Sequence, residues 1–577
     1  MSLLTVAVAA AILLFAAYWV YGTVLARLFR LDRNTQTPAV ELRDDVDYQP
    51  LERSSLLSQH FSAIAAAGPI VGPILAGVMF GWLPALIWIL LGAIFIGGVH
   101  DIGALSASIR HKARSIAEVV REHMSRRSFI LFLLFVWFAL LYIIVAFTDI
   151  TASSFIGVLE LESGEKVRGG GIATSSFLYL LLPLVMGLLI RFARLPVGIA
   201  TLIFLPLVGV AIWAGQFIPF DLAAATGWDQ WTAHRVWNMA LLAYCFIASL
   251  VPVWLLLQPR GHLGGWFLFL ALLGGTVGLM LGGETIRYPR FVGWTSSKGE
   301  PLFPVLFITI ACGACSGFHA IIASGTTSKQ LRRETDAKLI GYGAMLMEAM
   351  VAVVSLSCVM RLATDAPAIT GGVKPNFLYA EGIGSFLAVL GVPVSFAVSF
   401  GLMAFTTFVY DTLDVCTRLG RYIIQELTGW RTRSGRVFAS VLTAAVPVPF
   451  LLQRSVDTAG RPIPIWKTFW ELFGASNQLL AALTLLGVTV WLWRTRRAAW
   501  VWFVCGLPTL FMYVMSMWAL LRIIRVDVAK SGFDYRPVTW VAMVLVALAA
   551  LMAVEAVLVF LGPTTSPPSR RLQPAPA

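Results

Sequence analysis

Charged residues are scarce in this sequence. Only 13% of the 577 residues are Asp, Glu, Lys or Arg, against roughly 25% in soluble globular domains, while 58% are hydrophobic. So little charge cannot coat several water-soluble domains, which excludes a soluble enzyme and a disordered protein as descriptions of the whole chain. The six cysteines are too few for the disulfide framework of a secreted scaffold. The composition predicts an all-α protein that crosses the membrane many times.

Common catalytic motifs are missing as well. The sequence holds no H-E-x-x-H, G-x-S-x-G or P-loop motif, so the signatures of common intramembrane proteases, hydrolases and ATPases are absent. Cys312 and Cys315 form a C-x-x-C pair in an apolar stretch without a second pair, and small-residue helix packing explains it better than metal or redox chemistry. We therefore expect no enzymatic activity, no bound metal and no cofactor.

About fifteen stretches are suited to be transmembrane helices, which need roughly 20 mostly apolar residues. They lie near residues 3–27, 60–80, 82–108, 128–158, 173–190, 195–215, 236–258, 264–282, 302–324, 339–360, 384–410, 437–453, 467–493, 498–521 and 537–562. Residues 61–99 contain no charged residue or histidine and are long enough for two crossings. We expect a tight helical hairpin there, with its turn at Gly81-Trp82-Leu83-Pro84.

The positive net charge has a topological explanation. Lys and Arg total 43 and the net charge is +13, and basic residues gather in alternate loops, for example in residues 110–127, 329–338 and 418–436. Cytoplasmic loops hold an excess of Lys and Arg, so we expect the N-terminus outside and the C-terminus in the cytoplasm. The charge requires no nucleic-acid partner, and the predicted environment is the lipid bilayer.

Two of the predicted spans carry helix-breaking clusters. Residues 67–73 read Ala-Gly-Pro-Ile-Val-Gly-Pro, where two prolines remove amide donors and two glycines ease bending. Residues 311–319 form a comparable small-residue cluster, and the loop charges direct this span oppositely to the first. Two interrupted spans of opposite direction are typical of inverted repeats with a substrate site between discontinuous helices. A packing kink is the alternative for the first cluster.

Six segments carry a resemblance to a known family. They are residues 60–73, 309–320, 324–330, 341–348, 414–422 and 472–480. Over roughly residues 30–500 the sequence resembles the carbon starvation protein A family. The resemblance implies a transporter of the bacterial inner membrane that takes up peptides under carbon limitation, while close relatives take up pyruvate with protons. It also implies the LeuT-like fold of the amino acid/polyamine/organocation superfamily, with two inverted repeats whose first helices are unwound.

The resemblance also implies a domain organisation. Residues 1–28 form an extra N-terminal membrane helix, 29–55 a cytoplasmic loop, 56–493 the transporter core with both repeats, and 494–562 C-terminal membrane helices. Residues 563–577 are rich in Pro, Ser and Arg, so we expect a disordered cytoplasmic tail. The chain is shorter than the longest members of the family and has fewer C-terminal helices.

Several acidic residues lie at membrane depth. Placing a charged side chain there costs from about 2.5 to more than 10 kcal/mol, so such residues usually face a partner or a cavity and mark an ion or substrate path. The candidates for ion or proton coupling are Asp101, Asp149, Glu348, Asp411 and Asp414. Histidines near these spans could relay protons, because histidine titrates near neutral pH. We expect protons rather than sodium as the coupling ion.

Structural roles are the alternative for each of these carboxylates. Asp149 and Glu348 could accept hydrogen bonds from neighbouring helices. Asp101 could pair with Arg110 or Lys112 at the cytoplasmic end of its span. Asp411 and Asp414, three residues apart on one helix face, could pair with Arg418, Arg421 or another loop arginine.

Eight residues are the candidates for substrate binding, because they either interrupt a span or place a polar group inside one. They are His60, Gly68, Pro69, Gly72, Ser316, His319, Asn477 and Gln478. The half-helix N-termini at the two interruptions would offer amide donors to a carboxylate. A structural buried histidine and plain adhesion between helices by the two amides are the alternatives.

These features predict a secondary active transporter. We expect it to import a small carboxylate-bearing nutrient, a short peptide under carbon starvation, driven by a proton gradient. The first alternative is a pyruvate/proton symporter of the same family. An alternative of another class is a membrane-embedded nutrient sensor or channel without coupled uptake.

Overall fold

The computed structural model describes residues 2–44, 48–160, 166–430, 432–456, 462–531 and 537–561, called the described chain below. The predicted tail, residues 563–577, lies outside these residues. Helices dominate the described chain, together with two antiparallel strand pairs, β1 (Val158–Glu160) with β2 (Lys166–Arg168) and β3 (Ser455–Val456) with β4 (Pro462–Ile463). The expected all-α polytopic class is confirmed.

Twelve helical stretches of the described chain are long and apolar enough to cross a membrane. They are α1 and α2 (Leu3–Trp19, Tyr21–Leu28); α6, η1 and α7 (Trp82–Gly92, Ala93–Gly97, Gly98–Arg110); α9 (Arg126–Ile156); α10 (Gly169–Phe192); α11 (Val197–Phe217); α14 (Leu257–Leu281); η3, η4 and α17 (Glu334–Asp336, Lys338–Gly343, Ala344–Met360); α20 (Val394–Thr428); α21 and α22 (Arg433–Ala445, Val448–Leu452); α23 (Ile465–Arg496); η5 and α24 (Trp502–Gly506, Leu507–Ser531); and α25 (Pro537–Leu561).

The remaining helices are shorter, broken or more polar. They are α3 (Pro38–Glu41), α4 (Arg53–Ile64), α5 (Gly68–Phe80), α8 (Ile116–His123), α12 (Leu222–Thr226), α13 (Gln230–Leu250), α15 (Leu302–Thr309), α16 (Gly317–Ile322), η2 (Ala323–Thr327), α18 (Pro367–Thr370) and α19 (Pro375–Ala388).

The number of spans differs from the fifteen expected. The described chain has twelve, or thirteen if the bent pair α4 and α5 counts as one. The two further predicted spans correspond to α13, whose Gln230, His234, Arg235 and Asn238 lower its hydropathy, and to the interrupted segment 302–324. Apolar content along the sequence does not distinguish a helix that crosses the membrane by itself from a more polar or broken helix inside the bundle.

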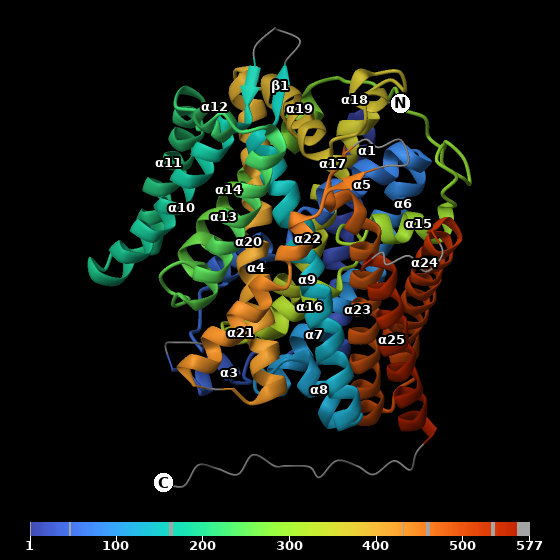
Figure 1. Ribbon diagram of the computed structural model, residues 1–577. Helices are drawn as coiled ribbons and strands as arrows, with labels where there is room; N and C mark the ends of the chain where they lie inside the picture. Colours follow the sequence, from blue (N-terminus) through green and yellow to red (C-terminus); the bar gives the residue numbers. More distant parts are fainter. Residues whose placement is uncertain are drawn as a thin grey trace.

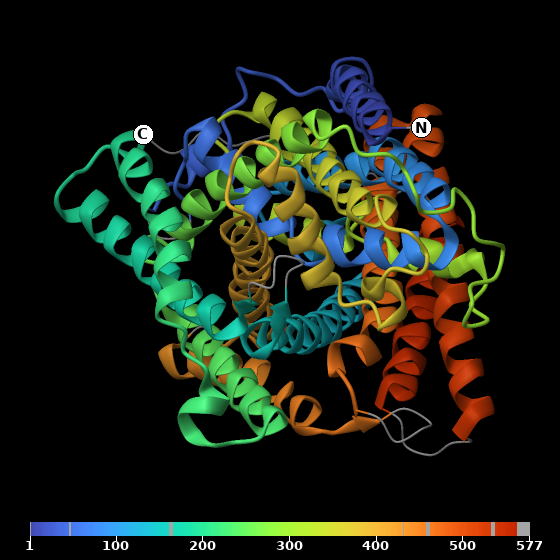
Figure 2. The same cartoon turned by 90° about the horizontal axis from the view of Figure 1, so that it is seen from above.

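The helices form a bundle with a buried centre. Seen from above, α20 lies near the middle, α10 and α11 at one edge, and α24 and α25 at the opposite edge (Figure 2). The most apolar parts of the membrane stretches that contain α17 and α23 are 94% buried, whereas those of α11 and α25 are 28% and 22% buried. Helices α11 and α25 lie on opposite sides of the bundle (Figure 1). The peripheral helices therefore present apolar side chains to lipid, while the central helices hold the polar residues of interest.

The predicted hairpin is present. Helix α5 ends at Phe80 and α6 begins at Trp82, with Gly81 between them at φ +92°. A Cβ atom at Gly81 would lie 2.6 Å from the carbonyl oxygen of Arg290. Only glycine therefore satisfies both the backbone angle and the close approach of the loop.

The first predicted interruption lies between α4 and α5. The two helices are bent by 46° at a short break, and Ala65 to Ala67 separate them. Pro69 occupies the first turn of α5, where its missing amide hydrogen costs nothing. The prediction of a broken helix is confirmed.

The second interruption lies between α15 and α16 and faces the first. Residues 310–316 separate the two helices. A Cβ atom at Gly68 would lie 2.3 Å from Sγ of Cys312, and one at Gly72 would lie 2.4 Å from the carbonyl oxygen of Thr309. The glycines of the first break thus allow the backbone of the second to pack directly against it.

Candidate functional site

A buried arginine joins three helices at the centre of the bundle. Arg260 lies in the first turns of α14 and is 1% exposed. Its Nε donates to Oδ1 of Asp411 at 2.6 Å, and its Nη1 donates to Asp414. Both aspartates lie on α20, three residues apart and on one face of the helix, as expected. We call Arg260, Asp411, Asp414, Tyr244 and Ser62 the Arg260 cluster.

Two hydroxyl groups complete the Arg260 cluster. Tyr244 of α13 donates to Oδ2 of Asp414 at 2.8 Å and accepts from Nη1 of Arg260. Ser62 of α4 donates to Oδ2 of Asp411. One guanidinium thus lies between two carboxylates in a buried setting, where such pairing is needed to offset the cost of desolvation.

Arg418, one of the expected partners of Asp411 and Asp414, hydrogen-bonds to the backbone instead. Arg418 donates to the carbonyl oxygens of Ala248 and Val251, at 2.7 Å each. Arg260 takes the place beside the carboxylates. Arg260 is not among the predicted site residues, because an isolated basic residue between two apolar stretches is typical of a loop between membrane helices. In fact α14 begins at Leu257, before the arginine.

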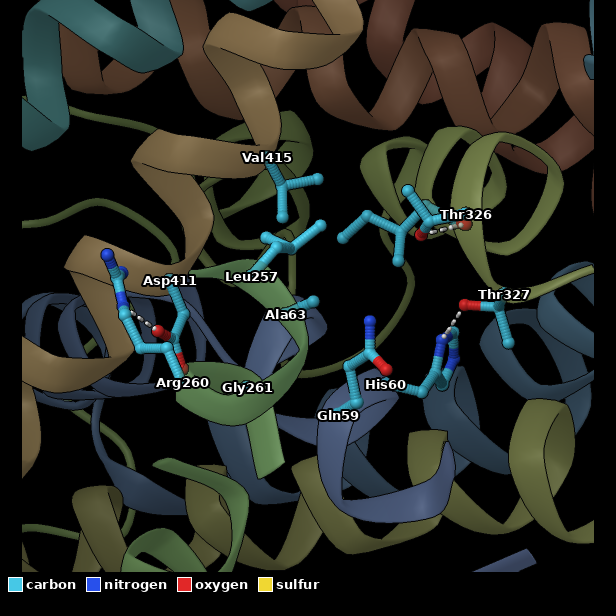
Figure 3. A pocket seen from close by; sticks show the side chains of 11 residues that line it. Gln59, His60, Ala63, Leu257, Arg260, Gly261, Thr326, Thr327, Asp411 and Val415 are labelled. Atoms are coloured by element: carbon cyan, nitrogen blue, oxygen red, sulfur yellow. Dashed lines mark hydrogen bonds and ion pairs between the residues drawn. The ribbon is translucent and has the colours of Figure 1, made fainter. Parts of the chain in front are cut away.

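A narrow pocket lies beside the Arg260 cluster, between α4, α14, α20 and the segment after α16 (Figure 3). Its lining residues are Gln59, His60, Ala63, Leu257, Arg260, Gly261, Ile322, Thr326, Thr327, Asp411 and Val415. About 370 Å³ of empty space separates the lining atoms, but the centre of a water molecule fits in only about 10 Å³ of it. The pocket is therefore narrow, with room for about one water molecule.

Three residues that line this pocket carry polar atoms without partners. Nη2 of Arg260, Nε2 of His60 and Oε1 of Gln59 are buried and have no hydrogen-bond partner among the described residues. The other ring nitrogen of His60 lies 2.8 Å from Oγ1 of Thr327. In Figure 3, Arg260 and Asp411 lie on one side, His60 and Thr327 on the other, and Gln59 between them. A guanidinium and an imidazole with unpaired nitrogens thus belong to the residues around the pocket.

A second polar cluster joins α7, α16 and α17. Nδ1 of His100 lies 2.7 Å from Oδ1 of Asp101, and Nδ1 of His319 lies 2.8 Å from Oδ2 of Asp101. Nε2 of His319 lies 3.1 Å from Oε2 of Glu348, within ion-pair distance but outside hydrogen-bond geometry. We call these four residues the Asp101 cluster, and none of their side chains is more than 1% exposed.

The Asp101 cluster corrects another expected pairing. Arg110 donates to Glu334 at 2.9 Å rather than to Asp101. Asp101 is instead held by two histidines, one of which belongs to the interrupted segment. The structure therefore brings together three of the predicted residues, Asp101, His319 and Glu348, which are far apart in the sequence.

Asp149 lies in a different environment. Its carboxylate accepts from Nδ2 of Asn238 at 3.2 Å and from the backbone amide of Trp466 at 2.9 Å, in the first turn of α23. His234 of α13 lies 3.5 Å away. A carboxylate at a helix N-terminus is favourable. Asp149 thus makes the interhelical hydrogen bonds named as the alternative, and it does not line the pocket.

Asn477 and Gln478 of α23 bind the backbone of the second break. Oδ1 of Asn477 accepts from the amide of Phe318 at 3.0 Å, and its Nδ2 lies 3.0 Å from Oγ of Ser316. Nε2 of Gln478 donates to the carbonyl oxygen of Phe307 at 3.1 Å and lies 3.3 Å from that of Cys315. These amides satisfy the backbone groups that the break frees from helical bonding.

Eleven of the thirteen predicted site residues divide into three groups, while Asp414 binds Arg260 without lining the pocket and Asp149 lies apart from all three. Among the substrate-binding candidates, only His60 lines the pocket, and among the coupling candidates only Asp411 does. Asp101, Glu348 and His319 form the Asp101 cluster. Gly68, Pro69, Gly72, Ser316, Asn477 and Gln478 shape and stabilise the two breaks.

Comparison with known proteins identifies the family. The model of the family described as carbon starvation protein CstA matches residues 2–369 and 363–519. This chain belongs to the CstA family. The peptide transporter CstA of Escherichia coli is 31% identical over 92% of this chain and 82% of its own length. The pyruvate/proton symporter BtsT of Escherichia coli is 30% identical over 92% of this chain and 83% of its own length.

The CstA relatives carry the names of transporters, which confirms that this family member is a membrane transporter rather than an enzyme. The peptide transporter CstA of Bacillus subtilis is 30% identical and covers 92% of this chain and 93% of its own length. Among solved structures, MhsT in complex with L-phenylalanine matches 89% of this chain and 99% of its own at 12% identity, with a TM-score of 0.47. No residue role follows from so loose an overlap.

Proposed function

We propose that this CstA family member is a proton-coupled importer of small carboxylate-bearing nutrients, with short peptides as its main substrates. The observation that carries the proposal is Nη2 of Arg260, buried beside the pocket without a partner among the described residues. Arginine presents a fork of donors that matches a carboxylate. Because Nε and Nη1 already bind Asp411 and Asp414, Nη2 is the donor left for a substrate.

His60 supports the same assignment. Its Nε2 has no partner among the described residues, and it carries the hydrogen in the neutral tautomer whose Nδ1 accepts from the hydroxyl of Thr327, so it can donate a second hydrogen bond to a carboxylate. The narrow pocket represents a closed form that must widen to admit a substrate, through movement of α4, α14 or α20. Such alternation of open and closed forms around a fixed site is the working principle of secondary transporters.

Charge balance in the Arg260 cluster supports coupling to protons. The cluster holds one guanidinium and two acidic side chains. A substrate carboxylate would add a further negative charge to a buried site, which is unfavourable unless a proton binds with it. Asp411 is the group we assign to this proton, because it shares Arg260 with the incoming carboxylate. Substrate and proton would then enter together.

Pyruvate is the second candidate substrate. It carries the same carboxylate, it is small enough for a narrow pocket, and a relative that covers most of this chain is named a pyruvate/proton symporter. A sensor or channel would not require the charge-balanced binding site described above.

We also propose an inverted-repeat core and the inner membrane as the location of the protein. The N-terminus lies outside and the C-terminus in the cytoplasm, following the distribution of Lys and Arg.

Transport by reconstituted protein tests the proposal. Proteoliposomes with an inward proton gradient are given labelled dialanine or labelled pyruvate, in parallel with a sodium gradient. We expect uphill accumulation of at least one substrate that collapses with a protonophore and does not need sodium. Uptake of neither substrate, or passage only down its gradient, would overturn the proposal in favour of a sensor or channel.

A further inference from the structure

Two histidines and a glutamate converge at the turn between α7 and α8, apart from the Arg260 and Asp101 clusters. His111 directly follows α7, and Glu122 and His123 end α8. One ligand atom from each lies within 4.8 Å of the others. Nε2 of His111 lies 2.9 Å from Nε2 of His123. We call these three residues the His111 cluster.

The backbone turns sharply to bring these residues together. Lys112 has φ 61° and Ala113 has φ 52°, a left-handed conformation that residues other than glycine rarely adopt. Ser115, just before α8, donates to Glu426 of α20 at 3.0 Å. The return of α8 towards the end of α7 is thus fixed by contacts on both sides of the turn.

The hydrogen bonding of His111 prepares it as a ligand. Its Nδ1 lies 2.6 Å from the carbonyl oxygen of Ala107. A carbonyl can only accept, so Nδ1 carries the hydrogen, and Nε2 presents its lone pair towards His123. Metal-binding histidines commonly have this second hydrogen bond to a carbonyl or carboxylate.

The other two residues complement His111. His123 is 3% exposed, and its Nε2 lies 2.9 Å from Nε2 of His111, while Arg494 is nearby. Glu122 is exposed and provides both a negative charge and a route from water.

The spacing of the two nitrogens fits a shared ion. Two nitrogens at about 2.05 Å from a metal lie about 2.9 Å apart at a right angle and about 3.3 Å apart at the tetrahedral angle. The measured separation is 2.9 Å. A hydrogen bond between the two rings would have the same length, so this distance alone does not indicate a metal. The nearby carboxylate of Glu122 and the fixed tautomer of His111 favour a metal ion over a simple hydrogen bond.

We propose that His111, His123 and Glu122 bind a divalent transition-metal ion of the Zn²⁺ class, with water completing the coordination. Imidazole together with carboxylate suits Zn²⁺, whereas Mg²⁺ and Ca²⁺ prefer oxygen ligands alone. Nδ1 of His123 has no hydrogen-bond partner in the described chain, and Arg494 is close. Both features weaken binding, so we expect an exchangeable ion rather than a permanent structural one.

A bound ion would connect two elements next to the transport machinery. It would join the end of α7, the helix that carries Asp101, to α8. Helix α8 packs on α23, and the ring of His111 meets that of Trp491 on α23 edge-on, with centroids 5.8 Å apart. This inference does not depend on the proposed substrate or on proton coupling.

Direct metal binding tests the inference. Full-length protein without a histidine tag is stripped with a chelator and titrated with Zn²⁺ by calorimetry, and Co²⁺ absorption reports the ligand geometry. We expect one Zn²⁺ per chain. His111→Ala and His123→Ala should each weaken binding at least about 100-fold, and Glu122→Gln about tenfold, the lower range for loss of a supporting ligand.

A matched histidine variant provides the control. His262, whose Nε2 lies 2.8 Å from Oγ1 of Thr201 on α11, is distant in sequence from the cluster, and His262→Ala should bind Zn²⁺ as the wild type does. Monodisperse elution and unchanged metal-free thermal unfolding establish that the variants fold. Absence of stoichiometric binding to the wild type, or equal affinity in His111→Ala and the wild type, would overturn the inference.

Discussion

The side-chain oxygen of Asn477 accepts a hydrogen bond from the backbone amide of Phe318 at 3.0 Å. The two residues are 159 positions apart, and the amide belongs to the first turn of α16, immediately after the break. A discontinuous helix is thus stabilised by a side chain of an intact one. The Asp101 cluster depends on this support, because His319 follows Phe318 in α16.

Replacing Asn477 by Ala should destabilise the protein. The variant leaves the buried amide of Phe318 without its partner, at a cost of about 1–3 kcal/mol. Thermal unfolding in detergent should show a clearly lower midpoint, whereas Asn34→Ala, at an exposed position, should not. Equal midpoints for Asn477→Ala and the wild type would show that the break does not depend on this hydrogen bond.

Glycine at position 317 should be required for packing of the second break. A Cβ atom there would lie 2.4 Å from the backbone nitrogen of Ala481. Backbone cannot move aside as a flexible side chain can, so Gly317→Ala should cost about 1–3 kcal/mol. Gly198→Ala is the matched control, because a Cβ atom at that helical glycine meets nothing within 4 Å. Comparison of the two unfolding midpoints tests the prediction.

Arg260→Lys should abolish most uptake while preserving the charge. A lysine ammonium cannot replace the planar fork that binds both aspartates and leaves Nη2 for substrate. We expect at least a 100-fold loss of substrate affinity in proteoliposome or binding assays, with Arg287→Lys, an exposed loop arginine, unaffected. Wild-type affinity in Arg260→Lys would remove Arg260 from the substrate site while leaving the transporter assignment intact.

Asp411→Asn should separate substrate binding from proton coupling. If a proton binds with the substrate, wild-type affinity should rise as pH falls, by up to about tenfold per pH unit. The asparagine imitates the protonated carboxyl group, so the variant should bind substrate with little dependence on pH and exchange it without proton-driven accumulation. Binding and counterflow measured from pH 5 to 8 test this expectation.

Glu348→Gln provides the contrasting variant for proton coupling. Glu348 belongs to the Asp101 cluster and does not line the pocket. We expect it to keep the pH dependence of substrate binding. If Glu348→Gln loses that dependence and Asp411→Asn keeps it, the Asp101 cluster rather than Asp411 takes up the proton.

Zn²⁺ should raise the thermal stability of the wild-type protein through the His111 cluster. A ligand that binds only the folded state at 100 times its Kd contributes about 2.7 kcal/mol. Thermal unfolding with and without Zn²⁺ should therefore differ, and a chelator should reverse the difference. His123→Ala should show no such shift, and an equal shift in that variant would place the ion elsewhere.

Much of the site could not be predicted because its contacts join distant parts of the chain. Arg260 and Asp411 are 151 positions apart, and Ser62 and Asp411 are 349 apart. Patterns along the sequence identify an acidic residue at membrane depth but not the group that faces it. The sequence therefore predicts Asp411 and Asp414 as functional residues, but it does not identify Arg260 as their shared partner.

The sequence by itself determined the membrane setting, the two broken helices and the hairpin at Gly81. These follow from local physics, since lipid demands long apolar helices and since a close cluster of prolines and glycines weakens the hydrogen bonding of a helix. Only the tertiary structure decided which polar residues meet. Asn477 binds the backbone of a broken helix, Asp149 accepts from the first turn of α23, and Arg260 lines the pocket. A buried polar group needs a hydrogen-bond partner. Many residues of the sequence could serve as that partner, and only the fold determines which of them lies within reach.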